Sequence, residues 1–204
     1  MKKLSFLYLF VFFSVNAQVS DFPKLKKSYS GLFSLGSRST LSSFNAHTQT
    51  ATLGYGGNFR LQLGDRVSTD WFADYLPSAD GVTKREDFHI GWSVMYYLRG
   101  NTKIVQPYVV AGHCFDYSKF TEISNQQNSL ARLSSAVQGG FGFQFNCTNR
   151  LSFNLSSQFM GHLGKEIHEH VHNNVPEYEI VSTNQFEGHL LTTLGVTFKI
   201  VDLW

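Results

Sequence analysis

Residues 50–64 read TATLGYGGNFRLQLG, and every second residue in this stretch is apolar or glycine. The alternate positions carry threonine, glycine, asparagine, arginine and glutamine. Successive side chains of a β-strand point to opposite faces, so the pattern predicts a strand with one apolar and one polar face. The residues of the predicted apolar face are Ala51, Leu53, Tyr55, Gly57, Phe59, Leu61 and Leu63.

The same period of two recurs seven more times along the chain. It is clear in three segments and weaker in four, and no helical period separates them. Strands that follow one another without a helix pair most economically as antiparallel hairpins, so the sequence predicts an all-β fold of eight strands. In 106–120 the assignment of faces stays open, because residues 108–111 are all apolar. The clear segments are 135–146, 151–163 and 194–200, and the weaker ones about 31–39, 67–76, 88–98 and 106–120.

The predicted connections alternate between long and short. Successive connections of an antiparallel meander lie at opposite ends, so all long loops leave one end of the sheet and all short turns the other, as in a barrel that crosses an outer membrane. The long connections are 40–49, 77–87, 121–130 and 164–187, and the short ones 64–66, 99–105 and 147–150.

The polar faces of these strands are rich in glycine, serine, threonine, asparagine and glutamine. Such small side chains can line the inside of a narrow closed sheet, which leaves the apolar faces to contact lipid. The sequence therefore predicts an eight-stranded antiparallel up-and-down transmembrane β-barrel. The alternative, a soluble lipocalin-like barrel, has the opposite polarity, with apolar residues inside.

The first 17 residues have the features of a secretory signal peptide. Two lysines precede an apolar stretch of 12 residues, and small residues stand before Gln18. Twelve apolar residues are too few to span a bilayer as a helix. We therefore expect a signal peptide at 1–17, a short periplasmic leader at 18–30 and the barrel at 31–204, which places the protein in the outer membrane of a Gram-negative bacterium.

The composition agrees with this expectation and excludes one class of partner. Without residues 1–17 the chain has 15 Lys and Arg against 15 Asp and Glu, so it lacks the surplus of positive charge that a nucleic-acid binder needs. Aromatic residues make up 15% and charged residues 16% of the whole chain, which suits a surface that contacts lipid. Cys114 and Cys147 are predicted about 30 Å apart and therefore unpaired.

Two segments carry a resemblance to a known family. The strand entry QPYVVAG at 106–112 and the last strand GVTFKI at 195–200 resemble the small eight-stranded outer-membrane barrels, which include the OmpA transmembrane domain and the OmpX-like and OmpW-like proteins. The resemblance covers roughly 30–204 and implies a monomeric barrel in outer-membrane lipid. Family members commonly end on an aromatic residue, and here Phe198 and Trp204 both fit that role, so the register of the last strand stays open.

Charged residues on the predicted inward faces have both signs, which predicts that they pair and fill a lumen too narrow for general diffusion. Tyrosines and tryptophans on the outward faces are predicted to form the aromatic girdles at the membrane interfaces. The inward charged and titratable residues are Arg38, Arg60, Asp70, Asp74, His89 and Lys199, and the outward aromatic ones are Tyr55, Tyr75, Tyr96, Trp71 and Trp92.

The long loop at 164–187 is rich in histidine. His168, His170 and His172 alternate along the chain, so in an extended segment neighbours lie about 7 Å apart on one side and two of them can share a Zn²⁺, Ni²⁺ or Cu²⁺ ion. The outer two would lie about 13 Å apart, so a complete site needs a bend or further ligands. The sequence offers Glu166, Glu177 and Glu179. The alternative is a solvated outer loop that binds no metal.

His162 and His189 flank this loop and are also candidate metal ligands. They are expected to face each other on the inward side of the barrel rim, where polar residues bonded to their neighbours are the competing interpretation.

The sequence predicts a structural or surface-interaction role for the barrel: envelope integrity, adhesion, or capture of a surface ligand or envelope protein by the long outer loops. The alternatives are a metal-binding surface protein, a narrow channel and a lipid-modifying enzyme. No histidine is followed two positions later by serine, the pairing that lipid A deacylases share, so we expect no enzyme activity.

Overall fold

The computed structural model describes residues 30–44, 51–100, 104–173, 175–181 and 188–204. The predicted signal peptide at 1–17 and residues 18–29 of the predicted leader lie outside this range. Ten strands form: β1 Leu32–Phe44, β2 Thr52–Gln62, β3 Val67–Asp80, β4 Thr83–Tyr97, β5 Val105–Glu122, β6 Ser129–Asn146, β7 Leu151–Leu163, β8 Glu166–His172, β9 Val175–Val181 and β10 Gly188–Asp202.

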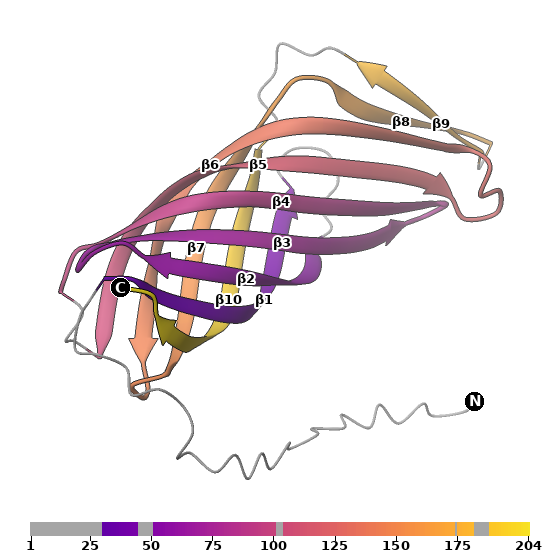
Figure 1. Ribbon diagram of the computed structural model, residues 1–204. Coiled ribbons are helices and arrows are strands. Elements are labelled where there is room, and N and C mark those ends of the chain that lie inside the picture. The colour runs from indigo at the N-terminus through magenta and orange to yellow at the C-terminus, as the bar shows by residue number, and fades with distance from the viewer. Residues whose placement is uncertain (1–29, 45–50, 101–103, 174, 182–187) are drawn as a thin grey trace, which may run out of the picture.

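Eight of these strands close into an antiparallel barrel in the order β1-β10-β7-β6-β5-β4-β3-β2 (Figure 1). The predicted eight-stranded barrel is confirmed. The remaining two, β8 and β9, pair with each other as a separate hairpin inside the predicted loop 164–187. Within the described ranges, no helix is long and apolar enough to cross a membrane.

The prediction of a long loop at 77–87 is wrong. β3 and β4 stay paired up to Asp80 and Thr83, and Gly81 begins the two-residue turn between them with a φ of 54°. β5 and β6 take up only the ends of the predicted connection 121–130, because β5 ends at Glu122 and β6 begins at Ser129. The hydrophobic alternation fades in 77–87 because outward positions become charged, as at Lys84 and Glu86, but backbone pairing does not depend on that alternation.

The structure decides the orientation of β5, which the sequence left open. Tyr108 and Val110 are buried in the lumen, at 4% and 7% exposed, whereas Val109 points outward and is 46% exposed. The inward row of β5 therefore continues through Cys114 and Asp116, both fully buried.

Large apolar side chains are exposed on the outside of all eight barrel strands, which is the polarity that the sequence predicts. Several aromatic rings on this surface contact each other across neighbouring strands. One row runs Phe33, Phe59, Trp71 and Trp92, and a second runs Tyr55, Tyr75, Phe88 and Tyr117.

The register of the last strand is also settled. Asp202 lies opposite Leu32, and an irregularity at Phe33/Ser34 shifts the pairing of β1 with β10 by one residue. Phe198 lies inside β10, while Trp204 follows the strand and lies against Gly31, whose φ of 80° suits glycine.

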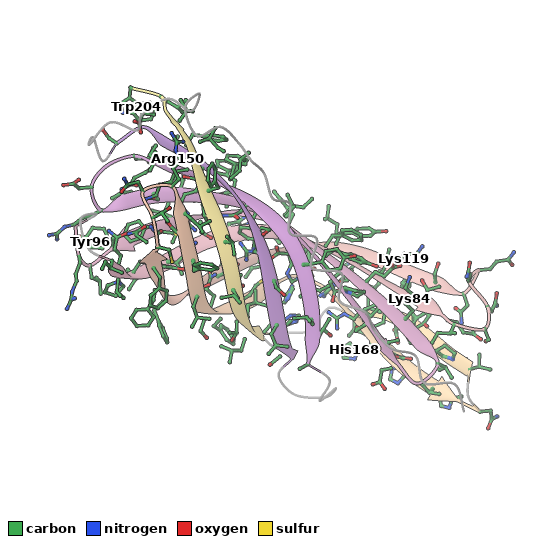
Figure 2. All side chains as sticks on the ribbon, turned by 90° about the horizontal axis from the view of Figure 1, so that it is seen from below. Lys84, Tyr96, Lys119, Arg150, His168 and Trp204 are labelled. Carbon is green, nitrogen blue, oxygen red and sulfur yellow. The ribbon has the colours of Figure 1, made fainter. Side chains whose placement is uncertain are left out.

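Cys114 is buried in the lumen, Cys147 is exposed in the β6–β7 turn, and both are free thiols, as predicted. The β6–β7 turn and the chain terminus at Trp204 lie at one end of the barrel, opposite the end that carries the β8–β9 hairpin, as the labels of Arg150, Trp204 and His168 in Figure 2 show.

Adjacent glycines of β6 offer a matched test of how closely the strands approach. A Cβ on inward Gly140 would meet the Ser157 carbonyl oxygen at 2.1 Å, whereas one on outward Gly139 would meet no atom closer than 3.7 Å. We expect Gly140→Ala to lower the free energy of unfolding by about 1–3 kcal/mol and Gly139→Ala to leave it nearly unchanged. Urea unfolding in detergent micelles measures both, and equal effects would contradict the packing described here.

Candidate functional site

The five histidines proposed as metal ligands fall into two separate groups. His162 and His189 point into the lumen, where they are 6% and 1% exposed, and their ring centroids lie 4.5 Å apart. The predicted facing arrangement of these two is confirmed. His168, His170 and His172 instead belong to β8, on the hairpin outside the barrel.

The hairpin is fastened to the outer ends of the barrel strands through one of its faces. Thr83, at the start of β4, bonds to the carboxylate of Glu169 and lies 2.9 Å from the hydroxyl of Tyr178. The Tyr178 ring packs edge-on against Phe120 of β5, with centroids 6.0 Å apart. We call this side, which carries Glu169, Pro176 and Tyr178, the platform face of the hairpin.

Two further bonds from the barrel reach the hairpin backbone. The side-chain amide of Asn128 donates to the carbonyl of Pro176 over 2.8 Å, and the Arg132 guanidinium donates to the carbonyl of Lys165. Pro176 is fully buried as a result. The described residues of the predicted loop therefore form a hairpin that rests on β4, β5 and β6.

The opposite side of the hairpin, its outer face, carries all three histidines of β8. Residues directly opposite in a ladder share a face, and the register pairs His168 with Glu179 and His170 with Glu177. His172 lies opposite Val175, which has no donor for a metal. The side chain of Glu166 lies outside the described part of the chain.

His162, together with His89, belongs to a buried polar cluster around Asp116. Nε2 of His89 and Nδ1 of His162 each lie 3.2 Å from a carboxylate oxygen of Asp116. The Arg132 guanidinium lies 3.5 Å from the same carboxylate, and Ser118 donates to it over 3.2 Å. This Asp116 cluster joins β4, β5, β6 and β7 at the outer end of the lumen.

A second polar network fills the other end. Nη1 of Arg60 donates to the side-chain oxygens of Gln144, over 2.8 Å, and Asn154, over 3.0 Å. Nε of Arg60 donates to Asp70 over 3.0 Å, and Arg38 pairs with Asp74 at 3.0 Å. Lys199 lines a small cavity beside Arg60. The predicted pairing of inward charges is confirmed for Arg38, Arg60, Asp70, Asp74 and His89, whereas the ion pairs among the described residues do not include Lys199.

Apolar side chains also occupy the lumen, which the sequence analysis did not anticipate. Arg38 stacks over the Phe72 ring at 4.4 Å, and Phe72 belongs to a buried cluster on the inward rows of five strands. Together with the two polar networks, this cluster fills the barrel with side chains. The residues of this cluster are Phe72, Cys114, Ala136, Met160 and Leu191.

Two titratable groups outside the membrane-spanning part have shifted pKa values. Hydrogen bonds from Ser124 and Asn128 stabilise the charged Glu122 carboxylate and lower its pKa below the ordinary value. Burial beneath the hairpin raises the pKa of Tyr178. At neutral pH the Glu122 carboxylate is therefore charged and the Tyr178 hydroxyl is neutral.

Among the residues whose side chains are described, no three His, Cys, Asp or Glu side chains stand together as a group that could hold a metal ion. Metal binding by the five histidines stays a prediction.

The closed barrel resembles several solved structures at low sequence identity. Neisserial surface protein A matches with a TM-score of 0.59 and 12% identity over 83% of this chain and 97% of that one. The outer membrane protein OprG from Pseudomonas aeruginosa matches with a TM-score of 0.56 and 15% identity, over 87% and 99%. Ail, the attachment invasion locus protein of Yersinia pestis, in complex with the heparin analogue sucrose octasulfate, matches with a TM-score of 0.51 and 13% identity, over 82% and 96%.

The protein is a small eight-stranded outer-membrane β-barrel in its fold. The predicted family resemblance is confirmed at this level, and the apolar outer surface is the one that such a barrel presents to lipid. The sequence matches no protein-family model and no curated protein.

Asp116 was missed by the sequence analysis, although the buried side chains of His89, His162 and Arg132 all lie within 3.5 Å of its carboxylate. The reason is the run of apolar residues at 108–111, which hid the orientation of β5. Had Tyr108 been assigned inward, period two would have placed Asp116 in the lumen beside His89, its direct neighbour in the ladder.

Replacing Asp116 tests whether this cluster stabilises the barrel. Asp116→Asn keeps the size of the side chain but leaves the positive charge of Arg132 without its carboxylate. We expect a loss of about 3–5 kcal/mol in the free energy of unfolding, measured by urea unfolding in detergent. Asp65→Asn, in the exposed β2–β3 turn, is the control and should have little effect. A loss as small as that of the control would show that the cluster does not stabilise the fold.

Proposed function

We propose that this outer-membrane barrel acts as a surface-interaction protein, and that the fastened β8–β9 hairpin is its interaction surface. The observation that carries the proposal is the set of contacts from Thr83, Phe120, Asn128 and Arg132 that hold the hairpin on the barrel rim. A surface that is ordered before binding loses less conformational entropy when a partner binds.

The exposed side chains of the hairpin are those of a protein-binding surface. Val175, on the outer face, is 51% exposed, and Val171 and Ile180, on the platform side, are still 52% and 40% exposed. Exposed branched apolar residues next to carboxylates and imidazoles favour a protein partner, because a protein surface can cover the apolar groups and pair with the polar ones.

A sulfated ligand of the kind bound in the Ail structure is less well suited to this hairpin. Its outer face carries the carboxylates of Glu177 and Glu179, which repel sulfate groups at neutral pH. We therefore infer a protein of the envelope or of another surface as the partner, with outer-membrane lipid around a monomeric barrel.

The filled lumen supports an interaction role over a transport role. The Arg60 network, the apolar cluster around Phe72 and the Asp116 cluster follow one another along the barrel. Eight strands enclose little more than their own side chains. The structural neighbours are named as surface or outer membrane proteins, which fits a barrel without enzyme activity.

Conductance in planar lipid bilayers distinguishes the two roles. Purified protein that shows the folded band on an unboiled gel is expected to give no discrete ion currents, because charged and apolar side chains fill the lumen. A large stable conductance from the wild-type protein would favour the channel alternative and contradict this interpretation.

Removal of the hairpin tests the interaction role directly. We expect cells that display the protein to adhere to protein-coated surfaces, and the adhesion to fall to the background of cells without the protein when residues 165–181 are replaced by a short Gly-Ser linker. Asp65→Asn, altered at the other end of the barrel, should adhere like wild type. Equal adhesion by wild-type and hairpin-less cells, at equal surface levels, would overturn the proposal.

A further inference from the structure

The outer face of the β8–β9 hairpin carries two histidines and two glutamates at neighbouring positions of its ladder. We call His168, His170, Glu177 and Glu179 the hairpin cluster. His168 lies directly opposite Glu179, and His170 directly opposite Glu177. We propose that the hairpin cluster binds one divalent transition-metal ion of the Zn²⁺ or Ni²⁺ type.

The ladder supplies the donors that a single strand cannot. Side chains directly opposite in an antiparallel pair have Cβ atoms about 4.5–5.5 Å apart, and residues two apart on one strand lie about 7 Å apart. Imidazole and carboxylate side chains projecting from the corners of such a rectangle can converge on one ion at about 2.0–2.2 Å. The second strand thus replaces the bend that an isolated His-rich loop would need.

The register also changes the set of ligands from the one that the sequence suggests. His172 lies opposite Val175 and about 13 Å along the strand from His168. His162 lies inside the barrel and bonds to Asp116. The proposal therefore assigns the ion to His168 and His170 with one or both glutamates, and excludes His172 and His162.

The hairpin cluster is accessible, because packing uses the other face. His170, Glu177 and Glu179 are exposed, whereas Glu169, Pro176 and Tyr178 make the contacts with the barrel. Since the four donors do not already stand together as a metal site, they must rotate about their side-chain bonds to bind. The fastened backbone keeps the two strands in register while they do so.

The donor types select the metal. Imidazole with carboxylate suits Zn²⁺, Ni²⁺ and Cu²⁺, whereas Ca²⁺ and Mg²⁺ prefer sites made of oxygen alone. Imidazole binds a metal only when it is neutral, so the titration below is made at neutral pH. Metal capture does not depend on the interaction role, since it needs only the hairpin cluster.

Isothermal titration calorimetry with ZnCl₂ and NiCl₂ as probes tests the proposal. It uses the untagged full chain in detergent, from which a chelator has removed any metal. We expect one ion to bind per wild-type chain at neutral pH and binding to be lost in the double variant His168→Ala/His170→Ala. Glu177→Gln with Glu179→Gln should weaken binding by more than the roughly 10–100-fold that follows loss of an outer-shell partner of a ligand, because it removes direct ligands. The matched control His172→Ala should bind like wild type.

The heat-dependent gel shift checks that every variant is folded, since the replaced side chains lie on an exposed face. We expect a Kd of about 1–10 μM. Absence of binding to the wild-type protein at about 100 μM metal would therefore overturn the proposal. So would unchanged binding in the double histidine variant, or loss of binding in His172→Ala. Adhesion is measured separately, so failure of one proposal does not imply failure of the other.

Discussion

The whole structure depends on closure of the sheet by the pairing of β1 with β10. The hydrocarbon core of a membrane offers no water, so every backbone amide and carbonyl within it must find a partner in the protein. Pairing of the first barrel strand with the last removes the two free edges that an open sheet would expose. The ladder from Leu32 and Asp202 to Phe44 and His189 provides this closure along the full length of β1.

Closure at eight strands then dictates what the inside can contain. The lumen is narrow, so the inward Gly142 leaves room for the ring of Tyr108 from the neighbouring strand, and the inward Gly140 lets the backbone at Ser157 approach closely. Charges enclosed in this way must be paired, because an unpaired buried charge is costly. The Arg60 network links β2 with β6 and β7 across the lumen, and the Asp116 cluster joins the four consecutive strands β4 to β7.

At the outer end the strands continue beyond the apolar belt and carry the hairpin with its exposed histidine and glutamate side chains. Backbone pairing extends β3 to β6 past the point at which outward residues become charged, as at Lys84 and Lys119. The β8–β9 hairpin rests on this extension and turns its histidines away from it. Fastening on one face is what leaves the other face available for a metal ion or a partner.

The sequence by itself determined the eight strands of the barrel and the polarity of all but β5, because period two reports directly which side chains face lipid. It predicted the inward positions of Arg60, His162 and His189 for the same reason. Only the tertiary structure decided the end of β3 at Asp80, since alternation disappears where both faces are polar. The tertiary structure alone showed that Asp116 lies at the centre of a cluster and that Glu177 lies opposite His170. Register sets which residues are partners across strands, and no local pattern in the sequence determines register.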